Sequence, residues 1–573
     1  MAPKTHRSRR TLGLASLAAA LLFAPISLGQ ERGRLERGQP EASLAAPSLV
    51  HWAIQDHALK LALPQKIPAS EALLKRARQL LASKNPQIRQ EALLLLGHSK
   101  DPGDRARIVD SVQKQKDQDL RERAIFALGL KGDTIAQFQL GRILESRDES
   151  GRSKALAALA CGLSKDGRPI SSEITVYAQE LLRLGMRSHA DELAGTLFGF
   201  SKDAGREFLS SFLKGRSSGG AAKEASSRKG KASPTEPQVL RSVLLASLGR
   251  IAATQGETRI LLTELNNKRQ PALLAFRIAW GLLQNDGKAL DKRERERLVA
   301  ALNKRMRLRE PELAGICLLA ITRLDRKLGL ATARKELKAR NKRPMLLPAS
   351  LLTLGRLGTS KDLNLLYESY ESLPDQDSRA AWCLAISESH RRLAPAEWPL
   401  ASGLAPEAEL PQPLPTLRSL AAGAKGKPSS LQLAAAIALA ELQDKHSINL
   451  LMDLASVTRQ AGLRRQLGIA IVALQAPTLS VSSEELHIES IEWSVLDTLA
   501  AGGHPSLWKS ILSYLDHKAL PANAKTRLLR LANVAASGPG TRLQERLDKR
   551  FGPGPMPRLL QEVAGWQELP APR

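Results

Sequence analysis

The sequence predicts an all-α protein, an α-solenoid or superhelix of helical hairpins, and three observations carry this prediction. First, Leu and Ala dominate the apolar residues while aromatic residues make up only 3%, and both residues lose little side-chain freedom in a helix. Second, apolar residues recur at intervals of three and four, which is the period of one helix face. Third, similar segments return at intervals of 32 or 33 residues, as in proteins built from stacked repeats.

The first repeats end on regularly spaced glycines. Gly97, Gly129 and Gly162 close three similar segments, which are residues 85–98, 119–130 and 151–163. Each segment begins with polar residues and continues as an apolar helix face. A polar turn and a second, weaker helix follow, for example at 135–145. One such hairpin cannot bury its own apolar face, so stacking against its neighbours is expected to form a continuous core.

The pattern recurs with less regularity further along the chain. Its later copies are residues 239–250, 271–282, 311–325, 344–371, 378–388, 430–455, 462–475 and 525–538. Segment 480–497 has the most strand-like composition and is expected to be a capping element. We expect two or three array segments, because two stretches interrupt the pattern.

These interruptions set the predicted domain boundaries. Residues 214–237 are rich in Gly, Ser and Lys and predict a disordered basic linker, while the prolines of 398–428 predict an extended break. The predicted parts are a signal peptide (1–29), a lead-in segment (30–70), a repeat array (71–213), the linker (214–237), a second array (238–397), the Pro-rich break (398–428), a third array with a C-terminal cap (429–551) and a Gly/Pro-rich tail (552–573).

The repeat units resemble HEAT repeats of the bacterial type, similar to those of phycobilin-lyase-like proteins. The resemblance rests on an Arg/Ala-rich first helix, a closing Leu-Gly, a following Asp and a second helix, and it covers most of 85–163, 239–388 and 430–475. It implies an α-solenoid with an extended concave surface. It carries over no catalytic motif.

The N-terminus indicates export. Lys4, Arg7, Arg9 and Arg10 precede an uncharged Leu/Ala run that is too short for a bilayer span, and small residues stand before Gln30, as in a cleaved signal peptide. The alternative is an uncleaved membrane anchor. The paired arginines also resemble the twin-arginine export signal. We therefore expect a periplasmic or secreted protein whose mature chain has no transmembrane segment.

No motif in the sequence predicts catalysis, a cofactor or a metal site. A G-x-S-x-G match at 215–219 lies in the low-complexity linker, and 423–430 lacks the first glycine of a phosphate loop. The ten histidines form no zinc motif, and His51 and His57 do not share one helix face. The three cysteines, Cys161, Cys317 and Cys383, lie in apolar runs and are expected to be buried hydrophobes, although one disulfide stays open.

The charge distribution supplies a candidate binding surface. The net charge is +28, and residues 292–343 hold 17 Lys and Arg against 6 Asp and Glu. Such a stretch is either a solvated helix face or a site for a polyanion. The candidate residues are Lys304, Arg305, Arg307, Arg309, Lys338, Arg340, Lys342 and Arg343. The stretch contains no aromatic residue, which argues against stacking on single-stranded nucleic acid and against specific nucleic-acid recognition.

The function predicted from the sequence is non-enzymatic. We expect a scaffold that holds a protein partner on the concave surface of the array. One alternative is an electrostatic binder of an anionic envelope polymer or membrane surface through 292–343. Another is an enzyme whose site is assembled across repeats, which a compact polar pocket would distinguish.

Overall fold

The protein is all-α, and consecutive helices pack as hairpins in the manner of a repeat solenoid. The computed structural model describes residues 48–61, 69–146, 236–393, 413–475 and 507–537, apart from 115–116, 268, 286, 309, 340–342, 424–428, 459–460 and 518, together with 148, 149, 153, 157, 160, 493, 496 and 500. The described part contains 21 α-helices and three short 3-10 helices. The predicted signal peptide, most of the linker 214–237 and the tail 552–573 lie outside it.

The helices fall into two groups around two hydrophobic clusters, and two residues of the second group, Val243 and Ala246, belong to the cluster of the first group. The first group comprises α4 (Glu71–Leu80), α5 (Pro86–Leu96), α6 (Pro102–Lys114), α7 (Gln118–Lys131), α8 (Thr134–Glu145), α28 (Leu507–Leu515) and α29 (Ala522–Ser537). The second group begins with α3 (Leu49–Leu61), α14 (Glu236–Ile251), α15 (Gln255–Asn266), α16 (Ala272–Gln284), α17 (Lys292–Arg305), α18 (Pro311–Leu324) and α19 (Arg326–Ala339). It continues with η2 (Pro344–Leu346), α20 (Leu347–Leu357), α21 (Ser360–Ser369), η3 (Tyr370–Ser372), α22 (Gln376–Leu393), α23 (Leu414–Ala422), α24 (Ser430–Glu441), η5 (Lys445–Ser447), α25 (Ile448–Val457) and α26 (Ala461–Gln475).

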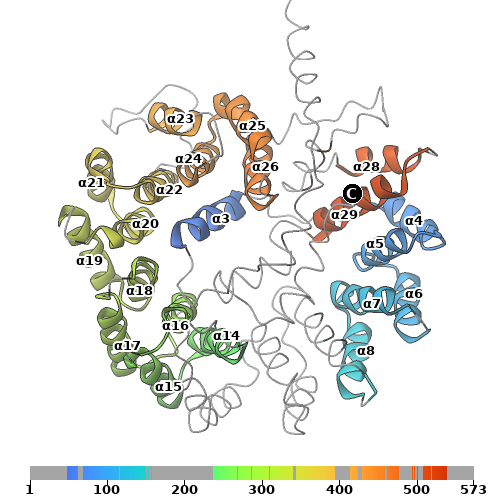
Figure 1. Ribbon diagram of the computed structural model, residues 1–573, viewed down its shortest axis with the longest axis horizontal. Helices are drawn as coiled ribbons and strands as arrows, with labels where there is room; N and C mark the ends of the chain where they lie inside the picture. Colours follow the sequence, from blue (N-terminus) through green and yellow to red (C-terminus); the bar gives the residue numbers. More distant parts are fainter. Residues whose placement is uncertain are drawn as a thin grey trace, which may run out of the picture. The chain divides into compact units, whose positions relative to one another are not determined.

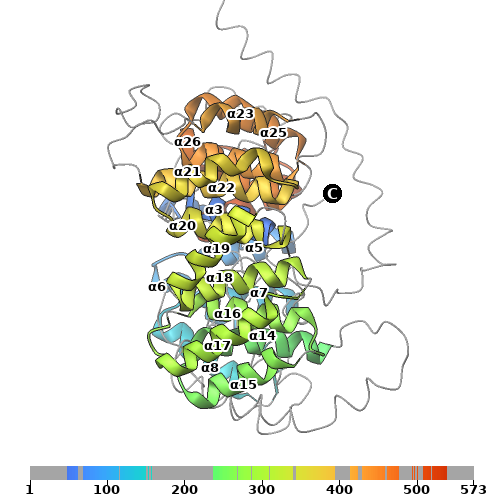
Figure 2. The same ribbon diagram turned by 90° about the vertical axis from the view of Figure 1, so that its left-hand side faces the viewer.

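The even-numbered helices α14 to α26 form one row, which we call the even row. Each packs on the next even-numbered helix, and Figures 1 and 2 show them stacked in chain order with the odd-numbered helices α15 to α25 on one side. The middle turns of the even-row helices are buried on almost every side. In α16, for instance, every residue from Leu273 to Leu282 is buried. Such helices are typical of an interior position, which is why this row forms the core.

Glycines mark the points where successive even-row helices come closest. A Cβ on Gly281 would lie 2.2 Å from the carbonyl oxygen of Ala246, and a Cβ on Gly355 would lie 2.6 Å from the Cα of Ala385. The first group repeats this arrangement, because a Cβ on Gly129 would lie 2.5 Å from the carbonyl oxygen of Ala160. Gly97 and Gly129, two of the three periodic glycines that close the first repeats, are therefore sites of backbone contact between neighbouring repeats, while Gly162 lies outside the described residues.

Arginine–aspartate pairs connect neighbouring hairpins. In each pair an arginine donates to an aspartate that lies 26 or 28 residues further along the chain. The pairs are Arg78–Asp104, Arg105–Asp133, Arg334–Asp362 and Arg418–Asp444. Asp133 and Asp362 also accept from backbone N–H groups at the N-termini of α8 and α21, so one carboxylate caps a helix and holds the adjacent hairpin.

Two predicted elements differ from expectation. Residues 414–422, inside the predicted extended break, form α23. The helix tolerates Pro415 because this residue lies in the first turn, where the backbone N–H that proline lacks would have no partner within the helix. Within the strand-like segment 480–497, the described residues Trp493 and Leu496 are helical. Together with Ala500 they have the three- and four-residue spacing of one helix face.

The C-terminal helices pack on the first repeats. α29 contacts α5, and α28 contacts α4. The buried carboxylate of Glu91 on α5 accepts from Nε of Arg530 at 3.0 Å and from Nδ2 of Asn533 at 3.1 Å. Residues about 440 positions apart in sequence therefore belong to one hydrophobic cluster.

No helix in the described part of the chain combines the length and the apolar character that a bilayer span requires.

Candidate functional site

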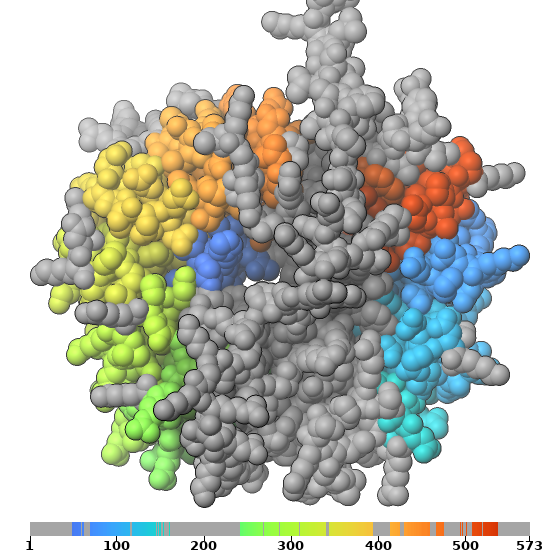
Figure 3. Space-filling view, in the orientation of Figure 1, coloured from blue at the N-terminus to red at the C-terminus, as the bar shows by residue number. Residues whose placement is uncertain are grey.

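The first described helix, α3, lies across the even row. It contacts α18, α20, α22, α24 and α26, and it lies on the side of the row opposite the odd-numbered helices (Figure 1). We call this side the inner face. In the space-filling view, α3 fits directly against the yellow and orange helices (Figure 3). The predicted lead-in segment 30–70 thus contributes a helix that packs on both the second and the third predicted arrays.

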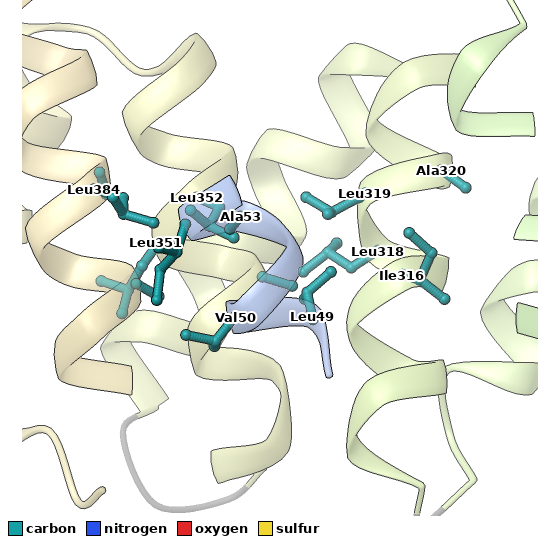
Figure 4. Packing of buried hydrophobic residues seen from close by; sticks show 14 of the residues in the cluster. Leu49, Val50, Ala53, Ile316, Leu318, Leu319, Ala320, Leu351, Leu352 and Leu384 are labelled. Carbon is teal, nitrogen blue, oxygen red and sulfur yellow. The ribbon is translucent and has the colours of Figure 1, made fainter. Parts of the chain in front are cut away.

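Apolar side chains on one side of α3 enter the inner face. Figure 4 shows Leu49, Val50 and Ala53 between the side chains of α18 and those of α20. Gly315 on α18 leaves room for this contact, since a Cβ there would lie 2.8 Å from Cδ2 of Leu49. Trp52 contacts Trp280 of α16 edge to face, with ring centroids 4.8 Å apart. This face of α3 is therefore complementary to the helices beneath it.

A carboxylate of the inner face caps the N-terminus of α3. Oε2 of Glu312, on α18, accepts from the backbone N–H of Leu49 at 2.6 Å. Burial raises the pKa of Glu312, and the hydrogen bond from Leu49 opposes that rise. An anionic acceptor suits the first N–H groups of a helix, which have no partner within the helix and carry partial positive charge. The inner face thus fixes the direction in which this helix lies.

Two further carboxylates hold His57 near the other end of α3. Nδ1 of His57 lies 2.9 Å from Oε1 of Glu441, and Nε2 lies 3.4 Å from Oε2 of Glu388. His57 is only 1% exposed. An imidazole donates from both nitrogens only when it is protonated, so the two carboxylates favour the imidazolium.

The pKa shifts follow from this arrangement. Burial alone would lower the pKa of His57, but its hydrogen bonds with Glu388 and Glu441 outweigh burial and raise it. Burial would likewise raise the pKa of Glu388, but the hydrogen bond from His57 and the nearby cations lower it to about 2. The site therefore holds a buried charged cluster rather than neutral side chains.

The remaining charges around the cluster form a mixed network. Lys60 of α3 lies 3.5 Å from Glu388 and 3.1 Å from Asp56. Arg356 of α20 reaches both Asp56 and Glu388, and Arg391 of α22 lies 3.9 Å from Glu441. Oγ of Ser387 donates to Oε2 of Glu441 at 2.5 Å. A small pocket remains beside His57, lined by side chains of α3, α18, α20 and α22.

Outside this cluster, the same group of helices holds a tyrosine–histidine pair and two buried thiols. Tyr367 and His390 share a hydrogen bond of 2.6 Å between α21 and α22, and burial lowers the pKa of His390 to about 4. Cys317 and Cys383 are buried free thiols, as the sequence predicts, and burial raises the pKa of Cys317 to about 12, so it is not a nucleophile at neutral pH. Within the described residues, no group of three His, Cys, Asp or Glu side chains could hold a metal ion.

The predicted basic surface is only partly a surface. Lys304, Arg307 and Lys338 are exposed, and Arg343 pairs with Glu336. Arg309, Arg340 and Lys342 lie outside the described residues.

Arg305 does not belong to that surface, contrary to the prediction. It is 4% exposed. Its guanidinium donates to the carbonyl oxygens of Leu265, at 2.6 Å, and of Asn267. These carbonyls lie at the C-terminus of α15, where a helix leaves acceptors without partners. Arg305 is therefore a cap for a neighbouring helix.

Sequence reasoning missed the α3 site. His51 and His57 were expected to lie on different faces, and they do: His51 is exposed while His57 is buried. The carboxylate partners of His57 are more than 300 residues away in the chain, a separation that no local pattern reveals. The available signal was the 13-residue amphipathic segment LVHWAIQDHALKL, which lies outside the repeat pattern.

Comparison with known proteins adds little. The sequence matches no protein-family model. No curated protein matches it either. Among solved structures, a crystal structure of an engineered protein from a structural genomics consortium is 15% identical, covering 71% of this chain and 99% of that chain at a TM-score of 0.26. A likeness at this TM-score says nothing about function.

Proposed function

We propose that this protein is a non-enzymatic scaffold that binds a helical segment of a protein partner on the inner face of its repeat array. One observation carries the proposal: the inner face already holds one helix, α3. Apolar contacts, a carboxylate cap and a charged cluster hold it there. Amphipathic helices bind grooves in this manner, with anchor residues on one face of the helix.

The remaining parts of the proposal concern the repeat class and the compartment. We assign the units to the HEAT-like class, because the Arg–Asp pairs and the closely approached glycines recur from hairpin to hairpin. The basic and apolar N-terminal segment supports export to the periplasm or beyond the cell.

A second candidate function is supported by the exposed cations. Lys304 and Arg307 lie at the end of α17, and Lys338 lies at the end of α19. Such side chains would bind an anionic envelope polymer or a membrane surface with an affinity that falls steeply as salt rises.

One capture experiment separates the two candidates. The mature chain from Gln30 is immobilised and exposed to envelope extract. The bound material is then eluted, first with excess synthetic peptide 48–61 and afterwards with salt up to about 0.5 M, where polyanion contacts weaken by orders of magnitude. A protein released by the peptide supports the scaffold, provided that the purified protein then binds the chain directly. A control peptide carrying Asp in place of His57 should release nothing.

The opposite outcome overturns the scaffold. In that outcome the bound material is polymeric and anionic, is not released by the peptide and elutes at low salt. It no longer binds when Lys304, Arg307 and Lys338 are changed to Glu.

A further inference from the structure

We propose that α3 is an exchangeable intramolecular ligand that occupies the partner site, and that the partner is a cationic amphipathic helix that replaces it. This inference rests on the proposed function, because it identifies the chemistry of the partner and states what keeps the site closed without one.

Several features of α3 fit an exchangeable ligand. It has 13 residues, and isolated helices of this length are marginal in water, so its helical state depends on docking. Glu312 of α18 accepts from its first N–H group at Leu49, at 2.6 Å, which is closer than the 3.4 Å contact of the His51 N–H with its own N-cap residue Ser48. Its described packing contacts belong to the helices of the even row and not to α4, the next helix along the chain.

The inner face specifies the partner through three contacts. Glu312 accepts from the first N–H groups of a helix, Trp280 receives an aromatic ring, and the pair Glu388 and Glu441 receives a cation. On α3 the aromatic ring and the cation are Trp52 and His57, five positions apart. A competing helix therefore needs apolar residues in its first turn, an aromatic residue, and a cationic residue five positions later.

Charge explains the preference for a cationic helix. The protein as a whole is strongly basic, yet carboxylates lie at both ends of the α3 site: the part-buried Glu312 at one end, and the part-buried Glu388 with the buried Glu441 at the other. Placing a carboxylate where His57 lies would bring three anions together with little water to screen them. Arg356 and Arg391 would compensate only in part, since Arg356 is also paired with Asp56.

The test uses the full chain and a fluorescent synthetic peptide of residues 48–61 as the probe. In the wild-type protein the tethered α3 competes with the peptide at an effective concentration on the order of millimolar, so binding in fluorescence anisotropy should be weak. His57→Asp should release α3 and strengthen peptide binding about 10-fold or more. The matched control is His51→Asp, the same substitution on the exposed side of α3, which should behave as the wild type.

The peptide itself provides a second comparison. A His57→Lys peptide should bind the His57→Asp protein as well at pH 8 as at pH 6, because lysine stays charged over that range. A peptide with His57→Asp should not bind. A protein that carries both His57→Asp and Glu441→Gln should bind the wild-type peptide about 10-fold more weakly than the His57→Asp protein does.

Two results would overturn the inference. One is a His57→Asp protein that keeps its helical circular dichroism and does not bind the peptide. The other is equal peptide binding by the wild type and His57→Asp, which would mean that α3 does not close the site. If the His57→Asp protein loses its helical circular dichroism, the peptide-binding test is repeated with a Trp52→Asp protein. Unfolding of both variants would show that α3 is a fixed part of the core, which also contradicts the inference. Each result is independent of whether envelope extract contains a partner, so failure here and failure of the capture experiment are distinguishable.

Discussion

Nδ1 of His57 lies 2.9 Å from Oε1 of Glu441, although 384 residues separate them in the chain. Their contact joins the first described helix to α24. Because Glu388 of α22 approaches the other imidazole nitrogen, one protonated histidine links three helices. The docking of α3 is therefore coupled to the charge of a single titratable group.

This coupling predicts a pH-dependent contribution to stability. The pKa of His57 is raised in the folded state, so its contribution is complete below its unfolded pKa of about 6.5 and is lost as pH rises through the folded value. The pKa of Glu388 is lowered to about 2, so its contribution is complete above its unfolded pKa of about 4.5 and is lost as pH falls through the folded value. Relative to His57→Gln, the wild type should be more stable by about 2–3 kcal/mol near pH 5.5. The difference should shrink as pH rises.

Urea unfolding of both proteins between pH 5 and 9 measures this difference. The exposed His51 provides the control, because His51→Gln should leave the pH dependence unchanged. A wild-type advantage that stays constant over the whole range would mean that the charge of His57 does not contribute to docking.

The repeat array could be predicted from sequence because its rules are local. Each helix carries its own apolar period, and the glycines recur where successive repeats come into backbone contact. The expected extended break at Pro415 is wrong, because a proline in the first turn of a helix looks the same in sequence as a proline in an extended segment.

The α3 site could not be predicted, for a different reason. Its parts are Glu312, Glu388 and Glu441, single carboxylates on three repeats, and no local pattern around any of them indicates that they face one helix. Only the fold brings them to one helix. Arg305 shows the same limit from the other side, since a basic run does not reveal which of its members turns inward to a neighbouring carbonyl.

The close-contact glycines predict an unusual effect of Gly→Ala substitutions. In an ordinary helix position the change stabilises by about 0.5–1 kcal/mol. At Gly129 and Gly355 the new Cβ would overlap backbone atoms of the adjacent repeat, so Gly129→Ala and Gly355→Ala should destabilise by about 1–3 kcal/mol. Gly256, near the start of α15, has open space around it, and Gly256→Ala should be neutral or stabilising. Thermal unfolding compares the three; stabilisation at all of them would remove the close-contact explanation.

Removal of the Glu91 carboxylate should lower the free energy of unfolding strongly. Its carboxylate accepts from Arg530 and Asn533, and it is the main attractive charge near Arg123, whose pKa burial lowers to about 10. Glu91→Ala would leave buried cations without this partner, which costs about 3–5 kcal/mol. Glu71→Ala is the control, since Glu71 is an exposed partner of Arg78 and should cost at most about 1 kcal/mol. Urea unfolding measures both, and equal costs would contradict the role of Glu91.

Substitution by Ala should destabilise the protein at Arg305 but not at Arg307. Arg305 is buried against the carbonyls that end α15, so Arg305→Ala leaves these acceptors without a partner and should cost about 2–4 kcal/mol. Arg307 is exposed, and Arg307→Ala should change stability by less than about 0.5 kcal/mol. If the protein also binds an anionic polymer, Arg307→Glu should weaken that binding and reduce its salt dependence. Urea unfolding together with binding to heparin, as a model polyanion, checks both expectations. Similar stability losses in the two alanine variants would show that Arg305 is not the cap of α15.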